Sequence, residues 1–201
     1  MKAKLLLLLF LATFSTYAQT NLVSNGGLES WGTGPSIIGW TIANNVTRNL
    51  TSYNGSFSAE LSYVSASPKI TTQVPLQAGV TYKIKFKYKY VDNNYDGTHP
   101  IALNISQNGS SSTLSTSTFA TNNSWTEKEA TFTPDANLSY DLSISTFSFD
   151  SDPFSVLIDH VQVYVEGTEQ YTKIPDVNFE NKLIALGIDS GVADGKVLTN
   201  D

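Results

Sequence analysis

Apolar and polar residues alternate one by one along much of this chain, which is the pattern of β-strands with one face in a core. The clearest stretch is residues 81–91, where tyrosine, phenylalanine and isoleucine alternate with four lysines. Shorter alternating stretches follow at turn-rich intervals, and together they predict about eight to ten strands. No helical period occurs before residue 175. We therefore expect an all-β fold, a β-sandwich of the jelly-roll type.

One position within residues 156–165 is unusual for a strand. Strict alternation places Asp159 on the same face as Leu157, Val161 and Val163. A carboxylate on an apolar face is costly unless it is paired or binds a metal. The chain has a single arginine, Arg48, so a ready cationic partner is scarce.

A helical period appears only near the C-terminus. Phe179, Leu183 and Leu186 are spaced as on one face of a helix. Asp176 is a suitable N-cap and Gly187 a suitable C-cap. The pattern predicts a short amphipathic helix with too little sequence around it to fold alone.

The N-terminal residues have the features of a secretory signal. Two lysines precede an apolar run at residues 5–11, and small residues precede Gln19. The run is well short of the roughly 20 residues that span a bilayer, and no later stretch is long enough either. We therefore predict a secreted or cell-surface protein. The expected division is a signal peptide at residues 1–18, a jelly-roll domain at 19–166, a linker at 167–173 and a helical part at 174–201.

Composition narrows the possible partners. The formal net charge is −6, which argues against nucleic acid, because phosphate binding requires a basic surface. The chain contains no cysteine. Its stability must therefore come from the core, with help from a metal where one is bound.

Several short motifs follow one another in a characteristic order. They are Asn25–Glu29, Gly39–Trp40, Asn54–Ser58, Ala78–Tyr82, Trp125 before a strand, and Leu157–Val161. In these motifs, residues 21–165 resemble the CenC-type carbohydrate-binding modules of families 4, 9 and 22, which are galactose-binding-like jelly rolls. The family usually has an acidic pair where this chain has Asp159 and His160.

The C-terminal part carries a second resemblance. Residues 174–189 read IPDVNFENKLIALGID, which is similar to the lead-in to leucine-rich repeats in secreted Bacteroidetes-type proteins. The repeats themselves do not follow. We therefore expect a fragment of a longer protein or a truncated copy, with any repeat-borne function outside this chain.

A structural calcium site is the first candidate for chemistry. Glu29 and Asp159 lie on the expected first and last strands, and their carboxylates meet if those strands are neighbours. Calcium takes six to eight oxygen ligands, and the turn at Asn54 to Ser56 is the natural source of more oxygens. The resemblance implies the same region. In the alternative, Glu29 is exposed and Asp159 caps backbone amides or pairs with a lysine.

A sugar-binding face is the second candidate. Aromatic rings would stack on the sugar, and polar side chains would bind its hydroxyls. The candidate residues are Gln73, Lys85, Lys87, Lys89, Asn104, Tyr95, His99, Phe147 and Phe149. The lysines suggest an acidic or sulfated glycan. In the alternative, the lysines form a solvated face, and the two phenylalanines belong to the core after a bulge.

Catalysis has little support in the sequence. No nucleophile motif or metal-protease motif occurs, and the only two histidines, His99 and His160, are far apart. The predicted function is a secreted, non-catalytic carbohydrate-binding module that targets a polysaccharide or a cell-surface glycan. The alternatives are a cell-surface adhesion or scaffold module that binds a protein, or an accessory domain of a glycoside hydrolase encoded elsewhere.

Overall fold

The computed structural model describes residues 20–91, 99–107, 112–118, 123–149, 152–168, 171–186, 188–189 and 192–198. The chain divides into two units, one of residues 21–169 and one that includes residues 170–201.

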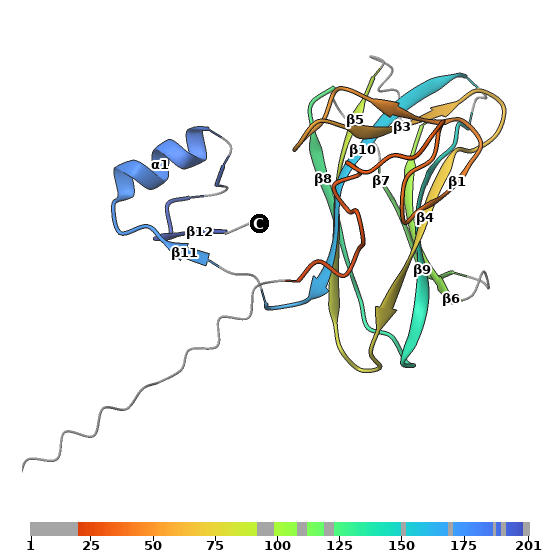
Figure 1. Cartoon of the computed structure of the whole chain (residues 1–201). Helices are drawn as coiled ribbons and strands as arrows, with labels where there is room; N and C mark the ends of the chain where they lie inside the picture. Colours follow the sequence, from red (N-terminus) through yellow and green to blue (C-terminus); the bar gives the residue numbers. More distant parts are fainter. Residues whose placement is uncertain are drawn as a thin grey trace, which may run out of the picture. The chain divides into compact units, whose positions relative to one another are not determined.

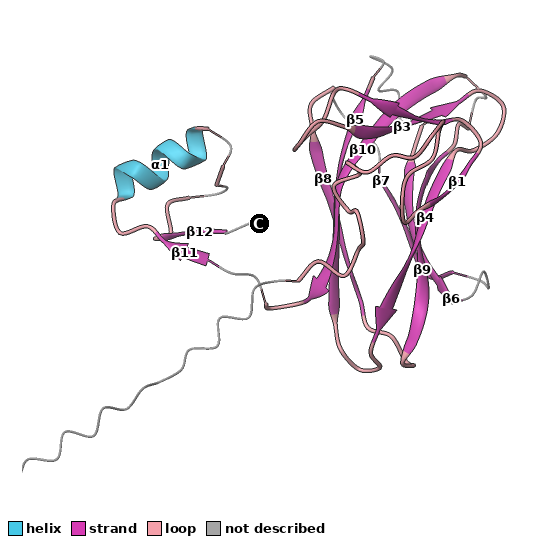
Figure 2. Cartoon of the chain, viewed as in Figure 1, coloured by secondary structure: helices cyan, strands magenta, loops and turns pink. Residues whose placement is uncertain are grey.

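Residues 21–169 form two five-stranded antiparallel sheets that pack face to face (Figure 1, Figure 2). In spatial order, the first sheet contains β1 (Thr41–Ala43), β4 (Lys69–Leu76), β9 (Leu138–Thr146), β6 (Ile101–Gln107) and β7 (Ser112–Thr118). The second contains β2 (Val46–Asn49), β3 (Ser58–Tyr63), β10 (Phe154–Val165), β5 (Tyr82–Tyr90) and β8 (Thr126–Phe132). The predicted jelly-roll β-sandwich is confirmed.

The core lies between the sheets and is built from alternate residues of each strand. In β5, the five residues that alternate with the lysines, from Tyr82 to Tyr90, are all buried. In β9, Tyr140, Leu142 and Ile144 face them from the other sheet and are fully buried. Burying a large apolar side chain contributes roughly 1.5–3 kcal/mol, so this double row supplies much of the stabilisation. The aromatic face predicted for residues 81–91 is therefore confirmed.

The alternation predicted for residues 156–165 is wrong beyond Asp159. The pairing of β10 with β5 shifts register between Asp159 and Gln162, and His160 has a positive φ of 51°. This is a β-bulge, which inserts an unpaired residue and reverses the alternation. Asp159 is in register with Lys87, on the outer face of the second sheet, whereas Val161 is buried in the core.

Asp159 is nevertheless buried. Its exposed fraction is 0 %, and that of Leu157, also on the outer face, is 2 %. Other segments of the chain must therefore cover this part of the outer face and exclude water from Asp159.

The second unit contains β11 (Tyr171–Lys173), α1 (Val177–Ala185) and β12 (Lys196–Leu198), with β11 and β12 paired antiparallel. Residues 171–173, expected as linker, thus form a strand. Asp176 is the N-cap as predicted, and it accepts hydrogen bonds from the backbone N–H groups of Asn178 and Phe179. The C-cap is Leu186, and Gly187, the predicted C-cap, lies outside the described residues. No helix in the described part of the chain is long and apolar enough to cross a membrane.

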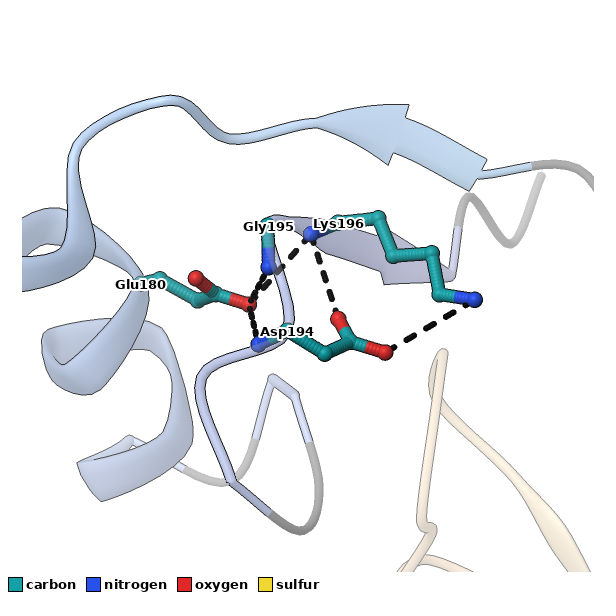
Figure 3. A network of polar contacts seen from close by, with 4 residues as sticks. All are labelled: Glu180, Asp194, Gly195 and Lys196. Atoms are coloured by element: carbon teal, nitrogen blue, oxygen red, sulfur yellow. Dashed lines mark hydrogen bonds and ion pairs between the residues drawn. The ribbon is translucent and has the colours of Figure 1, made fainter.

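The buried side chain of α1 is a glutamate. Phe179 and Leu186, expected on the apolar face, are 54 % and 61 % exposed, whereas Glu180 is 1 % exposed. Glu180 Oε1 accepts hydrogen bonds from the backbone N–H groups of Asp194 (2.6 Å), Gly195 (2.8 Å) and Lys196 (3.3 Å) (Figure 3). One carboxylate therefore ties the helix to the turn that leads into β12.

Replacing this carboxylate should loosen the turn. In Glu180→Ala, three backbone N–H groups lose their acceptor, which should lower the free energy of local unfolding by about 1.5–3 kcal/mol. Amide hydrogen exchange at residues 194–196 should accelerate accordingly. The matched control is Asn181→Ala, at an exposed position of the same helix, and it should leave these rates unchanged. Equal rates in both variants would contradict the role assigned to Glu180.

Candidate functional site

Two carboxylates from distant parts of the chain bind one loop, and we call Glu29, Asp159 and residues 53–57 the carboxylate clamp. Asp159 Oδ2 accepts hydrogen bonds from the backbone N–H groups of Tyr53 (2.7 Å) and Asn54 (3.2 Å). Its Oδ1 accepts one from the N–H of His160 (2.6 Å). Glu29 Oε1 accepts hydrogen bonds from the N–H groups of residues 56 (2.9 Å) and 57 (3.0 Å).

Glycines permit the close approach of these segments. Gly55 lies between the two pairs of donated N–H groups, with φ of 80°, and a Cβ there would collide with the Glu29 carboxylate. A Cβ on Gly26 would collide with the carbonyl oxygen of Val161. The Val161 N–H donates to the Gly26 carbonyl (2.8 Å). The N-terminal segment is therefore packed directly on the bulge that positions Asp159.

The electrostatics at Asp159 are unusual. Burial raises the pKa of this carboxyl group, hydrogen bonds from the three backbone N–H groups lower it, and the charge of Glu29 raises it again, so that the net shift is upward. Its cross-strand neighbour Lys87 turns its ammonium toward Glu127 instead (3.1 Å). Among the described residues, no basic side chain forms an ion pair with Asp159, and backbone N–H groups stabilise its charge only in part.

The clamp contains the four residues predicted to bind calcium. Glu29 and Asp159 contact the same loop, and the exposed residues Asn54 and Ser56 lie within that loop. A carboxylate has about four lone-pair sites, and the hydrogen bonds occupy three at Asp159 and two at Glu29. The donor set consists of oxygens, as calcium requires. No group of three acidic, histidine or cysteine residues occurs among the described residues, so backbone carbonyls or water would complete the shell.

The alternative for Asp159, a cap on backbone amides, accurately describes the contacts that are present. It does not compete with a cation, because free lone pairs remain on both carboxylates.

A different surface, on the first sheet, is rich in hydroxyl and amide groups, and we call it the hydroxyl face. It is the outer face of the sheet, and its outward side chains include Thr71, Gln73, Asn104, Asp141, Ser143 and Ser145. Gln73 and Asp141 are cross-strand partners, and Gln73 Nε2 donates to Asp141 Oδ1 (3.3 Å). A cleft of about 500 Å³ is lined by Ser24, Gly39, Trp40, Thr41, Thr71, Thr72, Gln73 and Asp141.

Phe147 and Phe149 follow β9 and stand outside the core. Phe149 is 68 % exposed and Phe147 is half-buried. Their ring centroids are 5.1 Å apart in an edge-to-face arrangement. They have the same parity as Asp141 and Ser145, the outward residues of β9. The alternative in which a bulge turns them into the core is therefore excluded.

The structure separates the residues predicted to bind sugar. Gln73 and Asn104 lie on the first sheet, whereas Lys85, Lys87 and Lys89 lie on β5 of the second. Because the sheets pack face to face, their outer faces point away from each other (Figure 1). The lysine row cannot share a sugar with the hydroxyl face.

His99 does not add to either face. His99 is 2 % exposed, and its ring lies 4.3 Å from that of Phe154, inside the domain. Tyr95 lies outside the described residues.

The lysine row is largely neutralised by glutamates of β8. Lys85 Nζ lies 3.4 Å from Glu127 and 3.7 Å from Glu129. Burial lowers the pKa of Lys85, but the charge of Glu127 together with Tyr164 and Glu129 raises it, and the net shift is upward. Burial raises the pKa of Glu127, but Lys87 and Lys85 outweigh it, and the net shift is downward. Two of the three lysines predicted to bind sugar are therefore held in ion pairs.

Asp141 is not among the predicted sugar-binding residues, although the alternation around Tyr140 and Leu142 places it outward. A cluster of aromatic rings on the outer side of the second sheet, formed by Tyr53, Trp125 and His160, is not predicted either. Two of these residues lie in a loop and a bulge, where alternation gives no information.

The domain is a β-sandwich with a cleft beside the polar outer face of its first sheet. The family model described as carbohydrate binding domain matches residues 20–153. The chain therefore belongs to this family of carbohydrate-binding domains.

Solved structures with the same fold include TmCBM61 in complex with β-1,4-galactotriose. It is 18 % identical, with a TM-score of 0.55, and the alignment covers 74 % of this chain and 100 % of that one. The enzymatically active domain of bacteriophage CBA120 tailspike protein 4 is 19 % identical with a TM-score of 0.52. That alignment covers 72 % of this chain but only 21 % of the tailspike chain. No curated protein matches in sequence.

Proposed function

We propose that this protein is a secreted, non-catalytic carbohydrate-binding module and that its sugar ligand lies on the hydroxyl face. The observation that carries the proposal is the cleft beside Gln73 and Asp141 in a domain of a carbohydrate-binding family. Export rests on the signal at residues 1–18, and the non-catalytic role on the lack of a catalytic motif in the sequence.

The hydroxyl face offers both kinds of contact that a sugar needs. Gln73 and Asp141 hold each other in place through their hydrogen bond, and amide and carboxylate groups of this kind suit the hydroxyl groups of a sugar. Asn104 pairs with Ser143 on the neighbouring strands and extends this polar row across β6. Phe147 and Phe149 supply apolar surface beyond the end of β9, as sugar sites combine apolar contact with a few polar groups.

The ligand we propose is a neutral glycan. The lysines that suggested an acidic or sulfated ligand lie on the other sheet, and two of them are paired with glutamates. The cleft itself contains one carboxylate, Asp141, and no basic residue in its lining. β-1,4-Galactotriose, which TmCBM61 binds in its structure, is a suitable first probe.

We propose in addition that the carboxylate clamp binds a structural calcium ion through Glu29 and Asp159, with Asn54 and Ser56 nearby. Both carboxylates bind the same loop, and no basic side chain among the described residues forms an ion pair with either of them, which supports this proposal. A bound cation would supply positive charge at the place where the N-terminal segment, the loop and β10 meet.

We also propose that residues 174–189 are the lead-in to leucine-rich repeats, on the basis of their sequence resemblance. The binding module is then residues 19–166.

Substitutions on the two sheets should separate the possible sugar surfaces. A glycan array should identify a neutral ligand, and calorimetry should then show that Asp141→Ala weakens its binding by on the order of tenfold or more, since few residues carry most binding energy. Lys89→Ala, at a half-buried position on the second sheet, is the control and should bind normally.

The reverse result, with Lys89→Ala impaired and Asp141→Ala normal, would move the site to the lysine row. A folded protein that binds no glycan would contradict the carbohydrate-binding function and favour a protein ligand.

Calcium should stabilise the sandwich through the clamp. Millimolar calcium should raise the midpoint of thermal unfolding by several degrees relative to a chelator, because ligands that bind only the folded state stabilise it. Glu29→Gln, at an exposed position, should fold and should reduce this shift, while Asp159→Asn should abolish it.

Glu129→Gln, a carboxylate outside the clamp, is the control and should keep the full calcium shift. An unchanged midpoint of the unsubstituted protein with and without calcium would contradict the calcium proposal.

A further inference from the structure

Three aromatic rings meet on the outer side of the second sheet, and we call Tyr53, Trp125, His160, Lys87 and Glu127 the aromatic patch. The centroids of Tyr53 and Trp125 are 6.1 Å apart with an interplanar angle of 68°. The His160 ring is 5.6 Å from that of Tyr53. Tyr53 is 42 % exposed, and Trp125 and His160 are half-buried.

The backbone holds two of these rings in place. The N–H group of Tyr53 donates to the buried Asp159, and His160 sits at the bulge of β10 with its unusual positive φ. Bulges redirect side chains and are common next to functional sites. A patch that is ordered before a ligand arrives loses less entropy on binding.

The polar ends of the rings are open to a ligand. Within the described residues, no hydrogen bond involves the Tyr53 hydroxyl, the Trp125 indole N–H or the His160 imidazole. The indoles of Trp31 and Trp40, in contrast, each donate to a backbone carbonyl (2.6 and 3.2 Å). Trp125 is therefore the one tryptophan whose indole N–H has no protein acceptor among the described residues.

The charges in the patch are balanced. Lys87 Nζ lies 4.6 Å from the centroid of the Tyr53 ring and 3.1 Å from Glu127. A ligand of either charge would gain from one of these groups and be repelled by the other. A neutral molecule with apolar ring faces and hydroxyl groups gains from both the rings and the charged pair.

We infer that the aromatic patch is a second carbohydrate-contact site, which takes a neutral pyranose whose ring face packs on Tyr53 and Trp125 and whose hydroxyls bind the polar groups around them. The inference rests on the proposed carbohydrate-binding function but concerns a different face. Because the hydroxyl face belongs to the opposite sheet, one molecule could hold two glycan segments at once, and linked sites raise avidity.

The three tryptophan indole N–H groups allow a direct test by ¹H–¹⁵N NMR, since Trp40 lines the cleft of the hydroxyl face and Trp125 lies in the aromatic patch. The uniformly labelled protein is titrated with β-1,4-galactotriose, xylohexaose and cellohexaose, and Trp125→Phe assigns the signal. We expect the Trp125 signal to shift and to reach saturation as the sugar is added. The same shift should occur in Asp141→Ala, in which the hydroxyl face is impaired.

Tyr53→Ala should weaken this second binding event by on the order of tenfold and leave the Trp40 response unchanged. Tyr53→Phe, which keeps the ring, should have a smaller effect and controls for the fold of the loop.

A Trp125 signal that stays fixed while a glycan shifts Trp40 would overturn the second site and leave the proposed function standing. Loss of the Trp125 shift in Asp141→Ala would likewise overturn it, because the two faces would then form one site. If none of the three sugars, and no ligand from the glycan array, shifts either signal, both proposals are overturned.

Discussion

The sandwich depends on a fully buried carboxylate that is stabilised in part by backbone N–H groups instead of a basic side chain. Asp159 takes hydrogen bonds from Tyr53, Asn54 and His160, and so it joins a loop from the first third of the domain to its last strand. Removing the partners of a buried charge costs several kcal/mol, so these N–H groups cannot move away freely. Glu29 adds a second, more exposed attachment to the same loop.

The bulge that creates this arrangement also decides what each face of the domain presents. It places Val161 and Val163 in the core and leaves Asp159 and His160 on the outer side of the second sheet. The aromatic patch is therefore built on the clamp, since Tyr53 is held by Asp159. The hydroxyl face arises from the regular strands β4, β9 and β6, and it does not depend on the clamp in this direct way.

The alternation of residues predicted the core row of β5 and the sandwich, because burial of one strand face leaves a period of two in the sequence. It could not predict the bulge, because a bulge leaves no mark in the sequence. One inserted residue turns every following side chain of the strand to the opposite face of the sheet. Nor could it tell that Gln73 and Lys87 point to opposite sides of the molecule. Both are outward residues of their strands, and only the strand order assigns them to different sheets. The pairing of Lys87 with Glu127 is likewise a long-range contact.

Amide hydrogen exchange at the clamp tests the central claim most directly. If Asp159 fixes the loop, the N–H groups of Tyr53 and Asn54 should exchange slowly although they lie outside the strands. Asp159→Ala, which removes the acceptor oxygens, should release both, whereas Glu29→Ala should release mainly those of residues 56 and 57. Rapid exchange of the Tyr53 and Asn54 amides in the unsubstituted protein, at the rate of exposed loops, would contradict the account.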